Sequence, residues 1–247
     1  MPQSPNDGVT TGSIRVIVRF AEVPGATGYR VEFYDSLQSA EREHRVSSTL
    51  TSGSPIIAIL NPKQTVYWRV RSRNDYGWGA LSAAIRMFTT PAATATSAIT
   101  PDAGGTLQPD PGYLTVTFPP GAVPSDTTVN FQLLASPQQP VPNFSFANRV
   151  FTLVATSNGA PVTQFDQPYT MRITYDDGDL LTARITDPTQ LNIVFWDGTA
   201  WIPLLPCTDC SINTADHTIT VVLDHFTEFA LVGPLPLQSL YLPLVQR

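Results

Sequence analysis

Lysine is almost absent from this chain. Lys63 is the only one, and the other basic residues are all arginines. Charged residues make up only 14% of the 247 positions, against roughly 25% in average soluble domains. The net charge is −6, and no stretch of the sequence is strongly basic. This balance argues against nucleic acid and against anionic membrane surfaces as partners. Low charge together with frequent Pro and Thr is typical of an extracellular protein.

Long apolar runs and helical periodicity are also lacking. No run approaches the ~20 apolar residues that a membrane-spanning helix needs, so we predict no membrane span. Residues 1–8 show neither the basic nor the apolar region of a signal peptide. We therefore expect that, if the protein is secreted, this sequence is a mature part of it or an excised fragment with an added Met. The only polar stretch that could form a helix is Ser36 to Arg45.

What the sequence does contain is apolar residues at every second position, which is the pattern of half-buried β-strands. Clusters of Gly, Pro, Asn and Asp separate these runs, as turns require. The runs cover residues 14–20, 29–34, 66–71, 114–118, 129–133, 151–155, 169–175, 191–196 and 219–223. The sequence therefore predicts an all-β fold made of two β-sandwich domains in tandem.

A stretch of small, uncharged residues divides the chain. It runs from Thr89 to Ser97, contains Pro91, and has the composition of a short linker. We place the first domain at 1–91, the linker at 92–97 and the second domain at 98–233. Residues 234–247 would then form an apolar C-terminal tail.

The first domain resembles a fibronectin type III domain over about residues 10–91. The resemblance depends on residues 23–31, on Leu60 to Arg71, and on Asn74 to Gly79 followed by Ser82 and residues 88–91. It implies an immunoglobulin-like sandwich in which the Tyr67 hydroxyl bonds back to the chain near Leu60. No Arg-Gly-Asp sequence is present, so integrin-type adhesion has no support.

The second domain resembles the ZU5-type β-sandwich of bacterial secreted and surface proteins. The matching residues are Gly104 to Leu107, Leu114 to Val123, residues 127–129, and a closing segment from His225 to Leu231. Residues 196–201 add a Trp-Asp-Gly-Thr-Ala-Trp sequence, in which Asp-Gly favours a hairpin turn. The segment 221–231 is predicted to be one continuous strand that closes the sandwich.

That closing segment contains His225, Phe226 and Thr227, which can be interpreted in two ways. In some ZU5-type domains such a triplet cleaves its own backbone, with the hydroxyl as nucleophile and the histidine as base. Here Thr227 would attack the Phe226 carbonyl and His225 would assist proton transfer. The other interpretation is that Phe226 packs in the core and His225 lies at the strand edge. We expect the chain to stay whole.

The two cysteines, Cys207 and Cys210, are the only ones in the sequence. A turn into a strand follows them instead of the helix that a redox pair normally opens, so we predict a local disulfide. The alternatives are free thiols and, after them, a metal or redox role. The Asp-Asp-Gly-Asp stretch at 176–179 lacks EF-hand spacing and indicates a solvated turn. We predict no metal site and no cofactor. The sequence has no motif of a serine hydrolase, phosphate-binding loop or zinc protease, so we predict no enzyme activity on an external substrate.

The aromatic residues and the tail remain as candidates for binding. A flat sugar-binding platform could be formed by Tyr76, Trp78, Trp196 and Trp201. The tail is apolar and would be unfavourable in water, so it could dock as a strand on its own domain or on a neighbour. Its candidate assembly residues are Leu240, Tyr241, Leu242, Leu244 and Val245.

These observations favour a non-catalytic extracellular structural or interaction protein. We expect a subunit of a cell-surface or filamentous assembly whose partners are proteins, either copies of itself or neighbouring surface proteins. The alternatives are a self-cleaving module and a glycan-binding adhesin.

Overall fold

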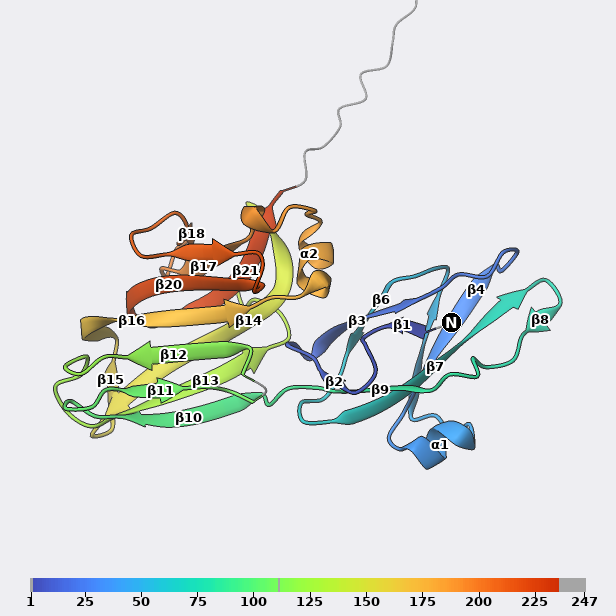
Figure 1. The fold of residues 1–247 in the computed structure, drawn as a ribbon, viewed down its shortest axis with the longest axis horizontal. Coiled ribbons are helices and arrows are strands. Elements are labelled where there is room, and N and C mark those ends of the chain that lie inside the picture. The colour runs from blue at the N-terminus through green and yellow to red at the C-terminus, as the bar shows by residue number, and fades with distance from the viewer. Residues whose placement is uncertain (1, 111, 236–247) are drawn as a thin grey trace, which may run out of the picture.

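The computed structural model describes residues 2–110 and 112–235, and it is built almost entirely of strands (Figure 1). This confirms the predicted all-β fold of sandwich domains. Strands β1–β9 form two sheets at one end of the molecule, and β10–β21 form two further sheets at the other. No helix among the described residues is long and apolar enough to cross a membrane.

The first sandwich consists of a three-stranded and a six-stranded sheet. The smaller sheet has the order β1 (Pro2–Ser4), β3 (Arg15–Phe20), β6 (Ile56–Ile59). The larger has the order β2 (Val9–Thr10), β9 (Arg86–Thr89), β7 (Thr65–Asn74), β4 (Gly28–Tyr34), β5 (Ser47–Thr51), and β8 (Gly77–Trp78) pairs with β7. Helix α1 (Leu37–Glu41) follows β4 and lies within the predicted helical stretch.

Alternating apolar residues of both sheets form the core of the first sandwich. Val16, Val18 and Phe20 of β3 pack with Val31 of β4 and Trp68 of β7 in one buried cluster. Because neighbouring strand residues face opposite sides, burial of Trp68 turns Tyr67 toward the outer face, where it is only half-buried. Among the described residues the Tyr67 hydroxyl has no hydrogen-bond partner, so the bond to the chain near Leu60 that the family resemblance implies is not formed. Trp68 is the aromatic residue of this strand that fills the core.

The second sandwich consists of a seven-stranded and a five-stranded sheet. The larger has the order β10 (Thr94–Ile99), β13 (Thr127–Leu134), β14 (Phe144–Ser157), β21 (Glu228–Pro234), β17 (Asn192–Trp196), β18 (Trp201–Pro203), and β15 (Ala160–Val162) pairs with β14. The smaller has the order β11 (Gly105–Leu107), β12 (Leu114–Phe118), β16 (Gln164–Thr174), β20 (Thr218–His225), β19 (Ser211–Asn213). Two short helices complete it, α2 (Asp177–Ala183) and the 3₁₀ turn η1 (Pro188–Gln190).

Two details differ from the sequence prediction. Residues 94–97, expected in the linker, belong to β10 and pair with β13. The segment 221–231, expected to be one strand, is divided between β20 and β21, which belong to opposite sheets. The chain therefore crosses the sandwich at Phe226 and Thr227.

Candidate functional site

The self-cleavage candidates lie at this crossing. Phe226 packs among Phe118, Phe165 and Tyr169, with ring centroids 5.9, 4.7 and 5.1 Å away. The Tyr169 hydroxyl donates to the His225 carbonyl oxygen at 2.8 Å. The crossing is therefore fixed by aromatic packing and a buried hydroxyl.

The two catalytic candidates have other partners. The His225 Nδ1 lies 3.0 Å from Asp224 Oδ1, and its ring contacts that of Phe195. The Thr227 hydroxyl donates to the Trp196 carbonyl oxygen at 2.5 Å. Cleavage requires that hydroxyl to give its proton to a base and to approach the preceding carbonyl carbon. This arrangement supports the structural interpretation of the triplet.

We predict that the purified protein is a single species with the full mass of 26.9 kDa. The reason is that the Thr227 hydroxyl is engaged with Trp196 and not with His225. Denaturing mass spectrometry measures this, with Thr227→Ala as the matched control that is unable to cleave. Separate pieces 1–226 and 227–247 in the wild type, absent from the control, would contradict the prediction.

The cysteine candidates lie together in the loop between β18 and β19. Cys207 and Cys210 are joined through their sulfurs, with Cα atoms 5.3 Å apart, and the Cys210 amide donates to the Cys207 carbonyl at 3.3 Å. The loop closed by this bond is short, so the bond fixes a turn and contributes little to overall stability. None of the described residues forms a cluster of His, Cys, Asp or Glu suited to a metal ion.

The four platform aromatics are not brought together. Trp201 is buried, its ring packs against Trp196 at 5.6 Å, and its indole N–H donates to the Pro140 carbonyl at 3.0 Å. Tyr76 and Trp78 lie at the tip of the other sandwich and are exposed. A single platform of all four residues is therefore wrong, and Tyr76 and Trp78 are the two that are exposed.

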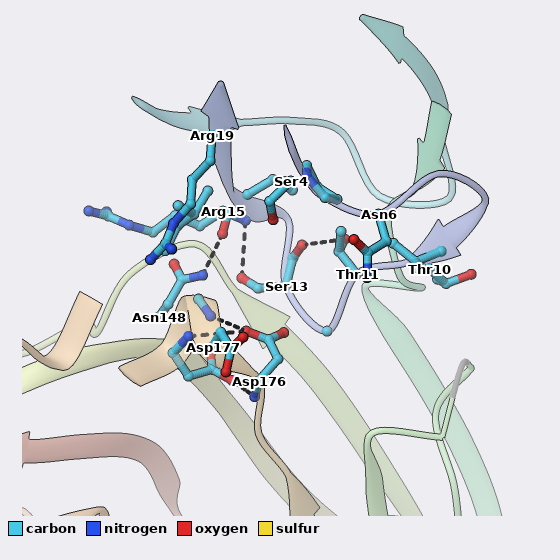
Figure 2. A pocket seen from close by; sticks show the side chains of 17 residues that line it. Ser4, Asn6, Thr10, Thr11, Ser13, Arg15, Arg19, Asn148, Asp176 and Asp177 are labelled. Carbon is cyan, nitrogen blue, oxygen red and sulfur yellow. Dashed lines mark hydrogen bonds between the residues drawn. The ribbon is translucent and has the colours of Figure 1, made fainter. Parts of the chain in front are cut away.

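A hollow lined by polar and charged side chains lies where the two sandwiches meet, and Figure 2 shows it from close by. Residues before and along β3 line one side, and Asn148 and the start of α2 line the other. The Asn148 side-chain amide donates to the Arg15 carbonyl oxygen at 2.5 Å. The hollow has a volume of about 390 Å³. We call this region the junction.

A bulge in β14 directs side chains into the junction. The register between β14 and β21 shifts between Phe146 and Val150, and Asn148 has a φ of 71°. Asparagine adopts this left-handed conformation more readily than most residues, and bulges often change the direction of a side chain. As a result Asn148 and Arg149, adjacent in sequence, are both buried at the junction.

Arg149 is held by two carboxylates from the start of α2. Its Nε donates to Asp179 Oδ2 at 2.6 Å and its Nη2 to Asp176 Oδ2 at 3.0 Å. The guanidinium also lies over the Tyr113 ring, 5.5 Å from its centroid. Asp176 caps α2 in a reciprocal capping box with Asp179. The stretch predicted to be a solvated turn is therefore a helix start, and its Asp179 is buried.

Burial dominates the electrostatics of this group. It raises the pKa of Asp179 from 3.8 to about 7, although the Arg149 guanidinium acts in the opposite direction. Burial alone would lower the pKa of Arg149, but the carboxylates of Asp179 and Asp176 outweigh it, so that pKa is raised. The arginine thus stays charged, and the proton affinity of Asp179 is set mainly by loss of contact with water.

The first sandwich closes over the guanidinium. A Cβ atom on Gly12 would lie only 2.0 Å from the Arg149 Nη1, so only glycine fits against this buried side chain. Ile14 packs on the hydrophobic core of the second sandwich. The Ala92 amide donates to the Asp110 carbonyl at 3.2 Å. Apolar packing and hydrogen bonds therefore connect the two sandwiches.

Comparisons with known proteins show only distant similarity. No family model matches the chain, and no curated protein matches it. Among solved structures, an α-L-rhamnosidase from Dictyoglumus thermophilum aligns with 94% of this chain and 25% of its own, at 9% identity and a TM-score of 0.31. The Streptomyces avermitilis α-L-rhamnosidase in complex with L-rhamnose aligns with 94% of this chain and 22% of its own, at 15% identity and a TM-score of 0.27. The chain thus spans about a quarter of the length of these enzymes.

Proposed function

We propose that this protein is a non-catalytic extracellular structural or interaction protein in which the two sandwiches act as one spacer. The observation that carries this proposal is the junction. Arg149 of the second sandwich is buried between two carboxylates and covered by Gly12 of the first. Asn148 of the second sandwich also donates to the Arg15 carbonyl oxygen of the first, and Ile14 of the first packs on the core of the second. Independently moving domains would not be expected to share a hydrogen bond and an apolar contact where they meet, because each separation would break both.

The finer assignment is part of the same proposal. The first sandwich would be a fibronectin type III domain and the second a ZU5-like domain, as their sequence motifs imply. Two sandwiches in series with a fixed angle between them suit a cell-surface or appendage subunit, which has to hold its ends at a constant separation. The low proportion of charged residues supports an extracellular location.

Spacer rigidity can be tested by adding one methyl group at the junction. We expect Gly12→Ala to force the sandwiches apart, because the new Cβ would overlap the Arg149 Nη1, which two carboxylates hold in place. Small-angle X-ray scattering should show a broader distribution of interatomic distances than for the wild type. Circular dichroism should remain that of two folded sandwiches.

The matched control is Gly79→Ala, where the nearest atom to a new Cβ is the Ser72 carbonyl oxygen at an ordinary 3.5 Å. Its scattering curve should superimpose on that of the wild type. The spacer proposal fails if the Gly12→Ala and wild-type curves also superimpose, since the junction would then tolerate rearrangement without a change of shape.

The apolar tail, with its assembly residues Leu240, Tyr241, Leu242, Leu244 and Val245, lies outside the described residues. The strand from which it continues, β21, pairs with β14 on one side and β17 on the other, so it is interior to its sheet. We propose that the tail adds as a strand to a neighbouring subunit. Light scattering should then show assemblies of the full chain that disappear on truncation after Gly233, whereas identical monomers would refute strand donation.

A further inference from the structure

The outer tip of the first sandwich concentrates positive charge around one exposed aromatic ring. Trp78 in β8 is 36% exposed. The guanidinium carbon of Arg30 lies 4.5 Å from its ring centroid, and those of Arg71 and Arg73 lie 5.8 Å away. We call these four residues the Trp78 cluster. Such a basic cluster was not expected from the sequence, because β4 supplies Arg30 and β7 supplies the other two arginines.

The strand register makes this cluster unfavourable for the isolated protein. Arg30 lies directly opposite Arg71, and Arg73 lies opposite Trp78. Like charges directly opposite each other on adjacent strands destabilise a sheet. Contact with the indole ring offsets part of that repulsion, since each cation–π contact at an exposed site contributes about 0.5–1 kcal/mol. An anion bound between the arginines would neutralise the remaining repulsion between their charges.

In the part of the chain that the structure describes, Arg71 is the one of these three arginines that is paired with a carboxylate. Arg71 Nη2 lies 2.5 Å from Glu32 Oε1, and Glu32 is buried. Within residues 2–110 and 112–235, no carboxylate lies within 4.0 Å of a nitrogen of Arg30 or Arg73. Two cations are therefore available to a ligand, and arginine can bind a carboxylate through two parallel hydrogen bonds.

A hollow of about 200 Å³ lies beside the cluster. Its walls are the 23–26 turn, residues 72–74 and residues 76–79, so Arg73 and Trp78 both line it. Tyr76 is 99% exposed at its edge. Figure 1 places β8 at the end of the molecule away from the second sandwich, so this tip is accessible when the junction is closed.

Charge is divided unevenly between the two sandwiches. Residues 1–91 contain ten Lys and Arg against seven Asp and Glu, and residues 92–247 contain four against thirteen. The second sandwich would repel a densely charged polymer such as DNA, which carries one charge per ~1.7 Å. A sparsely charged acidic polymer could instead bind at the basic tip without approaching the acidic end.

We propose that the Trp78 cluster binds a uronic-acid-containing polysaccharide. The apolar face of a sugar ring packs on the phenol ring of Tyr76 and on the part of the Trp78 indole that the arginines leave exposed, while its carboxylate binds Arg30 and Arg73. This site is a further property of the protein, because a spacer does not need it and the junction does not contribute to it.

The test is isothermal titration calorimetry of the full chain with oligogalacturonate, and with its methyl-esterified form as the uncharged probe. We expect binding only to the charged oligomer, weakened by added salt. Loss of one charge-assisted hydrogen bond should lower the affinity about tenfold or more in Arg30→Gln and in Arg73→Gln. Trp78→Ala should lower it as well, and Arg172→Gln, an exposed arginine on β16, should leave it unchanged.

Three results would overturn the proposal. The first is no binding of the acidic oligomer by the wild type. The second is equal affinity of Arg73→Gln, whose exposed side chain can be replaced without disturbing the core. The third is concentration-dependent self-association that the arginine variants abolish, because the acidic partner would then be the second sandwich of another copy. The scattering test of the spacer is unaffected by any of these results.

Discussion

Replacing Arg149 with leucine is expected to destabilise the second sandwich by about 3–5 kcal/mol, because it leaves the buried Asp179 carboxylate without its cation. Removing one partner of a buried pair is far more costly than removing an exposed charge. Urea denaturation followed by hydrogen-exchange mass spectrometry measures this loss, since peptides from the second sandwich report it separately from the first. Arg172→Leu, on an exposed strand position, should change stability by less than about 0.5 kcal/mol.

The stability lost in Arg149→Leu should depend on pH. Arg149 lowers the pKa of Asp179, so without it that pKa rises above the value of about 7 in the wild type. An acid with a raised pKa holds its proton in the folded state after the unfolded chain has released it. Stability therefore falls as pH rises from the ordinary value of 3.8 through the folded value. We expect Arg149→Leu to be less damaging at about pH 5 than at about pH 8.

A second substitution separates the charge from the packing. Asp179→Asn removes the buried charge and keeps an oxygen that can accept the Asp176 amide, which now donates to Asp179 at 2.8 Å. When Asp179→Asn is combined with Arg149→Leu, the free energy of unfolding should be about 2 kcal/mol higher at about pH 8 than in Arg149→Leu alone. The loss of stability should then no longer depend on pH. The ion pair would not stabilise the junction if Arg149→Leu alone had a free energy of unfolding within about 0.5 kcal/mol of the wild-type value at both pH values.

The strands of this protein could be predicted from its sequence because the pattern that forms each strand lies in consecutive residues. Alternation places Val16 and Val18 on the inner face of β3, and Gly and Pro fix where such runs end. The junction could not be predicted in this way. Gly12 and Arg149 are far apart in sequence, and nothing in their immediate surroundings indicates that they meet.

The wrong predictions have a common physical cause. The acidic stretch 176–179 has the composition of a solvated turn, yet a buried arginine from β14 pairs with Asp179 and offsets part of the cost of burying it. The segment 221–231 alternates like one strand, yet Phe226 packs with aromatics of the five-stranded sheet while Phe229 stacks on Phe151 of the other. In both segments, long-range contacts thus determine a structure that differs from the one the local sequence pattern predicts.

The second sandwich contains two short glycine sequences that are recognisable locally, but the requirement for glycine in them comes from a contact between distant parts of the chain. The Gly104-Gly105 and Pro119-Pro120-Gly121 sequences, separate in the chain, lie against each other in the fold. The Gly121 amide donates to the Pro101 carbonyl at 2.7 Å, and β11 pairs with β12 directly before the proline turn. A Cβ on Gly104 would lie 2.1 Å from the Phe118 carbonyl oxygen and 2.8 Å from that of Pro119.

We therefore expect Gly104→Ala to destabilise the second sandwich by about 3–5 kcal/mol, near the upper end of single-substitution effects. One part is the left-handed backbone, since Gly104 has a φ of 66° and a side chain there costs about 1–2 kcal/mol. The larger part is the overlap with backbone atoms, which cannot move aside as the end of a side chain can. Relief would require β11 to separate from β12, with loss of their hydrogen bonds.

Gly121→Ala isolates the backbone part of that cost. Gly121 has a φ of 78°, close to that of Gly104, but the nearest atom to a new Cβ is the Gln167 Cγ at 3.9 Å. Its substitution should cost only about 1–2 kcal/mol, measured by the same urea denaturation. Equal losses in the two variants would mean that left-handed backbone alone explains the motif. A much larger loss for Gly104→Ala would show that the close approach of the 104–105 and 119–121 turns is what requires glycine there.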